Sequence, residues 1–205
     1  MEKFKTIENS TTATVEEKRS KFIANLFYVG NVEEAEEIIK QNKKKYYDAR
    51  HNCYAYIIKD EMLVKKASDD GEPSGTAGSP ILNVLEKNNL CNVLAIVTRY
   101  FGGILLGAGG LVRAYTEATI KAVELAHIVE QEEGYEVEVT ILYPNLEKFK
   151  YYCQKNNIKI INVDYKENVK CIIEVTKVGK ETLLNRENES DIIEYKIIRE
   201  KYVRK

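Results

Sequence analysis

The segment between Ala67 and Ala118 constrains the fold of this chain most, because it concentrates residues that interrupt regular structure. It contains eight of the 11 glycines and two of the three prolines. In its first part, Asp69–Gly78, glycine permits positive φ, proline fixes φ, and acidic and hydroxyl side chains bond to nearby backbone. We predict a compact loop here and call it the acidic loop. Its carboxylates and hydroxyls are those of Asp69, Asp70, Glu72, Ser74 and Thr76.

Regular structure should follow the acidic loop. Ser79 and Pro80 have the residue types of an N-cap and a first helical position, so a short helix is predicted from there to Asn88–Asn89. The continuous apolar run Val93–Val97 is rich in β-branched residues, which predicts a strand buried on both faces.

A glycine-rich turn comes after this strand and opens a long helix, predicted from about Leu111 to His127. Free N–H groups and the positive end of the helix dipole make such a turn a ready anion site. Arg99 lies on the loop side of the turn, and Arg113 lies one turn into the helix, where it adds hydrogen-bond donors. The glycines concerned are Gly102, Gly103, Gly107, Gly109 and Gly110.

Two common phosphate-binding motifs do not fit this turn. No Lys-Ser/Thr pair follows the glycines, as a Walker A loop requires, and the acidic residue and βαβ context of a dinucleotide fingerprint are missing. Two interpretations remain open. Either the turn and the acidic loop form an anion pocket, or the glycines allow close packing while Arg99 and Arg113 pair with the carboxylates in a buried network.

The segment His51–Ile58 predicts a strand with polar residues at its start. His51 and Cys53 share one face of that strand, but i and i+2 side chains lie too far apart for a Cys–His nucleophilic pair. We therefore assign no catalytic residue, and we interpret His51 and Asn52 as structural or ligand-contacting residues. No metal site is predicted, and the three carboxylates of the acidic loop are the nearest candidate ligands.

Overall composition limits the classes of partner. A formal net charge of −1 argues against strong whole-molecule attraction to nucleic acid or to an anionic membrane. The four cysteines are far apart and form no CxxC, which suits a reducing interior better than a disulfide framework. The amino end is charged and no apolar run is long enough to span a bilayer, so we expect a cytoplasmic protein with no membrane partner and no cofactor.

The chain is predicted to form two α+β domains, over residues 1–132 and 133–205. The first begins with an edge strand over Thr6–Val15 and includes a helix capped by Asn31. In the second, strands and helices alternate in the ferredoxin-like order βαββαβ, with Asn145 as the cap of the first helix.

Four motifs resemble the YigZ/IMPACT family. They are Lys18–Ala24, His51–Tyr56, Asp69–Gly78 and Arg99–Tyr115. The resemblance implies an N-terminal domain of the ribosomal protein S5 domain 2-like type, and a C-terminal ferredoxin-like domain similar to domain V of elongation factor G, as in bacterial two-domain members. It also implies a link to translation, because eukaryotic IMPACT relatives act in translational control through a protein partner. This chain lacks their RWD domain, so that partner is not carried over, and the family supplies no catalytic residues to transfer.

Three functions remain open. The first is a non-enzymatic binding protein for RNA, the ribosome or a translation-associated protein, supported by Arg99, Arg113 and a basic C-terminal strand. The basic residues of that strand are Lys196, Arg199, Lys201, Arg204 and Lys205. The near-neutral charge and the lack of an RNP-like aromatic pair argue against nucleic-acid binding. The second is a nucleotide- or phosphate-binding enzyme that uses the acidic loop with Mg²⁺ and the glycine-rich turn. The third is a structural module whose loop network only maintains the fold.

Overall fold

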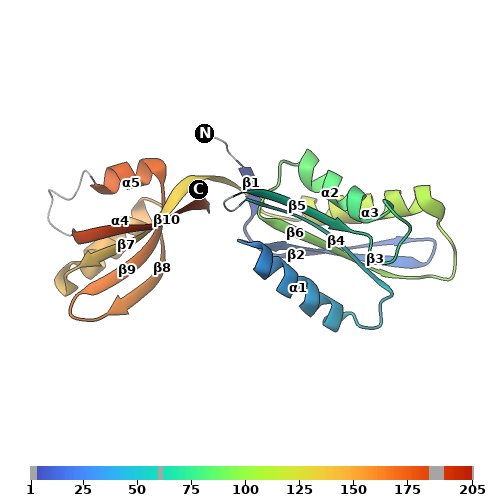
Figure 1. Ribbon diagram of the computed structural model, residues 1–205, viewed down its shortest axis with the longest axis horizontal. Helices are drawn as coiled ribbons and strands as arrows, with labels where there is room; N and C mark the ends of the chain where they lie inside the picture. The colour runs from blue at the N-terminus through green and yellow to red at the C-terminus, as the bar shows by residue number, and fades with distance from the viewer. Residues whose placement is uncertain (1–3, 60–61, 185–191, 205) are drawn as a thin grey trace. The chain divides into compact units, whose positions relative to one another are not determined.

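The computed structural model describes residues 4–59, 62–184 and 192–204, and the chain divides into two compact units. We call Phe4–Val129 the N-terminal unit and the part from Glu130 onward the C-terminal unit. Each has its own antiparallel sheet and its own buried core, so the fold is mixed α+β (Figure 1).

The N-terminal unit is built on a five-stranded antiparallel sheet in the order β2-β3-β6-β4-β5. These strands are β2 (Thr11–Glu17), β3 (Ser20–Tyr28), β6 (Val93–Tyr100), β4 (His51–Lys59) and β5 (Leu63–Ser68). The predicted edge strand over Thr6–Val15 is instead two strands, because β1 (Phe4–Ile7) leaves this sheet and bonds through Lys5 to the backbone of Asn89 and Cys91.

Helices cover both faces of this sheet. Helices α2 (Gly78–Lys87) and α3 (Gly107–Glu124) lie on one face and α1 (Val32–Lys45) lies on the other (Figure 1). The apolar run of β4 is continuous because alternate residues face two different cores. Cys53, Ala55 and Ile57 belong to the core under α2 and α3, whereas Tyr54, Tyr56 and Ile58 belong to the core under α1. Strand β4 is therefore buried on both faces.

The observed helix starts in this unit match the predicted ones only where the capping residue directly precedes the helix. Asn31 accepts a hydrogen bond from the Glu34 N–H at 2.8 Å, as its position in the sequence predicts. Helix α2, however, begins at Gly78 and not after Ser79. The carboxylate of Asp69 accepts hydrogen bonds from the Ala77 and Gly78 N–H groups, so a distant residue supplies the cap.

Helix α3 also begins earlier than predicted, at Gly107 rather than near Leu111. Gly107, Gly109 and Gly110 therefore belong to its first turn, and β6 continues through Arg99 to Tyr100 before the loop begins. Glycine has a low helix propensity, and this is why the sequence pattern placed the start one turn too late.

The C-terminal unit has the predicted order βαββαβ. It consists of β7 (Ile128–Ile141), α4 (Leu146–Lys155), β8 (Lys159–Tyr165), β9 (Val169–Thr176), α5 (Lys177–Leu184) and β10 (Ile192–Arg204). The strands pair antiparallel in the order β8-β9-β7-β10. Asn145 does not cap α4 with its side chain, because a short 3₁₀ turn (Tyr143–Asn145) leads directly into the helix. The predicted helical residues 185–188 lie outside the described part of the chain.

Candidate functional site

The strand register brings the sequence motifs to one end of the N-terminal sheet. His51 at the start of β4 pairs with Arg99 near the end of β6, and Lys21 beside the β2–β3 turn pairs with Tyr100. Strand β5 runs antiparallel to β4, so it also ends there and delivers the acidic loop. We call the connections over residues 18–19, 46–50, 69–77 and 101–106 together the loop end, which forms the right-hand edge of Figure 1.

Arg99 is buried at the loop end and forms an ion pair with the acidic loop. Its Nη1 lies 2.6 Å from Glu72 Oε1, and the two side chains are only 7% and 3% exposed. The Tyr115 hydroxyl of α3 donates to the same Glu72 oxygen at 2.8 Å. The rings of Phe22 and Phe101 flank the guanidinium at 5.6 and 5.5 Å. This cluster fastens the acidic loop to β6 and α3.

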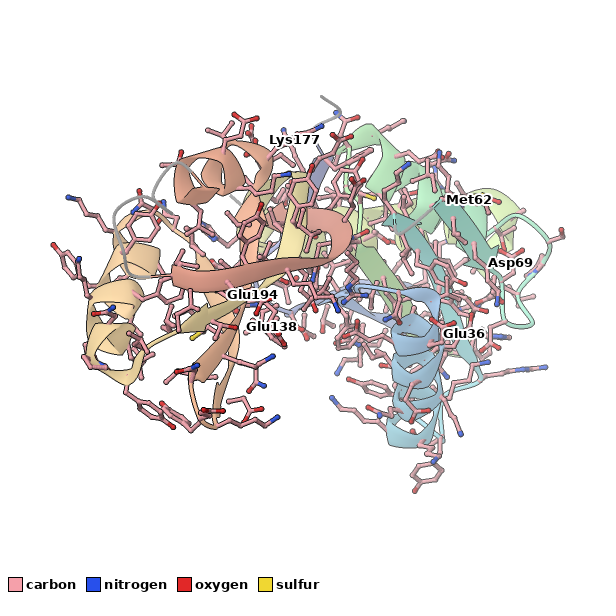
Figure 2. The ribbon with its side chains drawn as sticks, turned by 60° about the vertical axis from the view of Figure 1, so that its left-hand side comes forward. Glu36, Met62, Asp69, Glu138, Lys177 and Glu194 are labelled. Atoms are coloured by element: carbon pink, nitrogen blue, oxygen red, sulfur yellow. The ribbon has the colours of Figure 1, made fainter. Side chains whose placement is uncertain are left out.

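Asp69 organises the acidic loop from within (Asp69 is labelled in Figure 2). Its two carboxylate oxygens accept hydrogen bonds from the N–H groups of Gly75, Ala77 and Gly78 at 2.8 to 2.9 Å. Burial tends to raise the pKa of this carboxyl, but the three N–H donors outweigh it and hold the pKa below its ordinary value of 3.8. Asp69 is therefore a charged cap for the loop and for α2.

Asp70 joins the acidic loop to β4 and α1. One of its oxygens accepts the Asn52 N–H at 2.7 Å, and the other lies 2.6 Å from Lys43 Nζ. The His51 ring nitrogen Nδ1 is 2.9 Å from the Asp70 carbonyl oxygen. The Asn52 amide oxygen is buried and accepts a hydrogen bond from Thr98 Oγ1 at 2.8 Å. His51 and Asn52 thus lie within the scaffold that holds the loop.

The two hydroxyl residues of the acidic loop have different surroundings. Thr76 is buried and donates to the Pro73 carbonyl oxygen at 2.7 Å, which stabilises the turn. Ser74 is exposed at the surface of the loop. Of the two, Ser74 is the one that a ligand can reach.

The geometry of the carboxylates does not favour the Mg²⁺-dependent alternative. Asp69, Asp70 and Glu72 each already bind protein donors, and the described residues contain no cluster of three His, Cys, Asp or Glu side chains arranged for a metal ion. Burial, together with the nearby carboxylates, raises the pKa of the Cys53 thiol to about 12. Cys53 is therefore an unreactive thiol that donates to the Asp69 carbonyl oxygen at 3.0 Å.

The glycines of the loop end have two distinct roles. A Cβ at Gly102 would overlap the backbone of Arg19 and Ser20, and the Gly102 N–H donates to Ser20 Oγ at 3.1 Å. Gly102 therefore lets the β6–α3 loop lie against the β2–β3 turn. Gly103 and Gly107 have positive φ values of 82° and 73°, which few other residues adopt. Gly109 faces open space, and Gly110 is packed against Leu106.

Arg113 does not take part in the buried network, because its side chain is exposed on α3. The β6–α3 loop, which leads into α3, carries exposed apolar side chains, including Leu105 at 83%, Phe101 at 49% and Ile104 at 42%. Large apolar side chains exposed together often mark a binding surface. The apolar run Ile104–Leu106 is visible in the sequence, but no pattern there indicates that Ile104 and Leu105 are exposed.

Two basic residues of β10 are matched by carboxylates of β7 and β9, whereas Lys196 is exposed. Arg199 lies 3.0 Å from Glu136, and Lys201 lies 2.6 Å from Glu174. This pairing removes much of the positive charge that the sequence suggested for nucleic-acid binding. The Arg204 side chain and Lys205 lie outside the described residues, so their part in the prediction has no structural outcome.

Within the described residues, no helix is both long and apolar enough to cross a membrane.

Comparison with known proteins matches both units. Residues 18–123 match the Impact N-terminal domain, and residues 127–186 match a domain of unknown function, DUF1949. The IMPACT family member YvyE of Bacillus subtilis is 41% identical over 74% of this chain and 70% of its own length. The IMPACT family member YigZ of Escherichia coli is 37% identical over 75% of this chain and 76% of its own length.

A solved structure described as a hypothetical protein has 30% identity and covers 96% of this chain and 97% of its own, with a TM-score of 0.64. The rat protein IMPACT is 36% identical, but the match covers 46% of this chain and 31% of the rat protein.

Proposed function

The chain belongs to the IMPACT family, and on that premise we propose that it is a non-enzymatic binding protein linked to translation or its regulation. In this proposal the loop end of the N-terminal unit docks on the ribosome, through RNA or a translation-associated protein.

The family supports the link to translation. The motifs resemble those of the eukaryotic IMPACT proteins, which act in translational control. The rat relative matches this chain over 100 residues. Because this chain spans 31% of that relative, the proposal takes from it the general role and none of its partners.

One observation carries the choice of the loop end. The carboxylates of the acidic loop are held by protein donors, whereas many of the side chains exposed at and beside the loop end are cationic or apolar. The exposed cations include Lys18, Arg19, Lys21, Arg50 and Arg113, and the exposed apolar side chains include Phe101, Ile104 and Leu105. Such a surface complements a partner that carries negative charge and has apolar groups to bury.

Co-sedimentation with ribosomal particles tests this proposal. The test variant is Arg113→Glu/Leu105→Asp, which alters two exposed side chains at the loop end. Its matched control is Lys87→Glu/Leu125→Asp, which makes the same changes at exposed positions at the other ends of α2 and α3. We expect the wild-type protein and the control to sediment with ribosomes at low salt, and the test variant to lose about tenfold in the bound fraction.

Two results would contradict the proposal. If the wild-type protein stays at the top of the gradient, the ribosome is not its partner. If the test variant sediments like the control, the ribosome is bound through another surface. Treatment with RNase separates an RNA partner from a protein partner.

The nucleotide-binding alternative is tested separately. Because the three carboxylates are occupied, we expect no rise in melting temperature when Mg²⁺ and a panel of nucleotides are added at millimolar concentration. A clear rise that is lost in Arg113→Glu would favour the alternative.

A further inference from the structure

The C-terminal unit carries a pair of exposed tyrosines at one end of its sheet. Tyr143 lies in the 3₁₀ turn after β7, and Tyr165 is the last residue of β8. Their ring centroids are 6.4 Å apart and the ring planes differ by 31°. The two residues are 48% and 58% exposed, so the rings form an exposed aromatic surface and are not part of the core.

The backbone fixes the position of this pair. Val169, the first residue of β9, pairs with Ile141 on one side and with Tyr165 on the other. The ends of β7 and β8 are therefore aligned. The Tyr143 hydroxyl donates to the Lys166 carbonyl oxygen at 2.7 Å, which ties the 3₁₀ turn to the β8–β9 turn. The hydroxyl of Tyr143 is thus satisfied, whereas the rings remain accessible.

The segment of sequence that carries the pair is basic. Residues 142–167 contain five lysines and three carboxylates, a net charge of +2 in a chain whose total is −1. Lys166 Nζ lies 2.8 Å from Asp164, and Lys150 Nζ lies 2.8 Å from Glu147. Exposed ion pairs of this kind contribute little, so a phosphate group can replace the carboxylate as the partner of each lysine.

We propose that Tyr143 and Tyr165 form a stacking platform for an unpaired base of single-stranded RNA, with Lys150 and Lys166 available to its phosphates. Flat, accessible aromatic faces beside flexible cations are the arrangement that binds single strands without sequence readout. The inference goes beyond the proposed function, because it places a contact in the C-terminal unit that depends on neither Arg113 nor Leu105.

The test measures binding of fluorescent single-stranded oligoadenylate, about 12 nucleotides long, to the full chain by anisotropy. Replacing both rings in Tyr143→Leu/Tyr165→Leu should weaken the Kd at least about tenfold, because stacking contributes about 1–3 kcal/mol per base. The salt dependence of log Kd should stay unchanged, since no phosphate contact is removed. Lys166→Gln should instead reduce the salt dependence.

Two controls make the test specific. Tyr143→Phe/Tyr165→Phe keeps both rings and should bind like the wild-type protein. Tyr151→Leu removes another tyrosine of the same unit, which is 66% exposed and does not belong to the pair, and should also bind like wild type.

The proposal is overturned if the wild-type protein shows no binding at low salt, or if the Leu and Phe double variants bind equally. In the background of the loop-end variant Arg113→Glu/Leu105→Asp, the difference in oligonucleotide binding between the Leu and Phe double variants should persist. A failure of the loop-end proposal in ribosome sedimentation can then be separated from a failure of the tyrosine platform.

Discussion

A single oxygen of Glu72 connects three elements of the N-terminal unit. Oε1 accepts hydrogen bonds from Arg99 on β6 and from Tyr115 on α3, and the backbone of Glu72 belongs to the acidic loop. Because the site is buried, removal of Arg99 leaves the Glu72 carboxylate without its opposite charge, with only the Tyr115 hydroxyl as a donor.

We therefore expect Arg99→Ala to lower the free energy of unfolding by about 3–5 kcal/mol. Arg113→Ala should change it by no more than about 0.5 kcal/mol, because that side chain is exposed. Urea unfolding of the two variants measures the difference. Equal midpoints would show that the Glu72–Arg99 pair does not support the fold.

The pKa of Asp69 predicts a dependence of stability on pH. Since the carboxyl has a lower pKa in the folded chain than its ordinary value of 3.8, its contribution is complete above that value and is lost as pH falls through the folded pKa. Asp69→Ala should cost about 2 kcal/mol at neutral pH. The difference in free energy of unfolding between this variant and the wild-type protein should shrink below about pH 4, as measured by urea unfolding at a series of acidic pH values. A gap that stays constant at lower pH would contradict the charged cap.

At the scale of elements, the β6–α3 loop depends on glycine at one position and tolerates a side chain at another. A methyl group at Gly102 would overlap the β2–β3 turn, whereas one at Gly109 would point into open space. Gly102→Ala should therefore destabilise the protein by about 1–3 kcal/mol. Gly109→Ala should stabilise it by about 0.5–1 kcal/mol, because alanine has the higher helix propensity. Thermal unfolding measures the change in stability of each variant. A change of the same sign in both would contradict the different roles of the two glycines.

The sequence predicted the elements that depend on local patterns. The apolar runs of β4 and β6, the Asn31 cap and the βαββαβ order of the C-terminal unit can all be found in the chain without the structure. The misplaced features depend on contacts between distant residues. Asp69 caps a helix eight residues later, which made Ser79 an incorrect choice of cap.

The same limit applies to the candidate site. The sequence placed Arg99 and Arg113 together as cations beside a loop, and nothing in their spacing separated a buried arginine from an exposed one. Their difference depends on Glu72, which the fold brings next to Arg99, and on Tyr115, which donates to the same Glu72 oxygen. The outward orientation of Leu105 depends on the backbone at Gly103 and Gly107, which residue type alone did not determine.

At the scale of the whole molecule, the two units have separate hydrophobic cores. Phe149 is buried in the core of the C-terminal unit, among residues of β7, β8 and β9. Phe149→Ala should destabilise that unit by about 3–5 kcal/mol. Hydrogen exchange followed by mass spectrometry should then show faster exchange in residues 130–204, with residues 4–129 little changed. Faster exchange in both parts would show that the units unfold together.

All four cysteines are buried and outside any disulfide, and two lie in each unit: Cys53 and Cys91 in the first, Cys153 and Cys171 in the second. The buried thiols can therefore report how often each unit opens. An alkylating reagent added to the folded protein will label each thiol only at the rate at which its own unit opens. Peptide mapping of the label over time would give a separate opening rate for each unit, without any engineered probe.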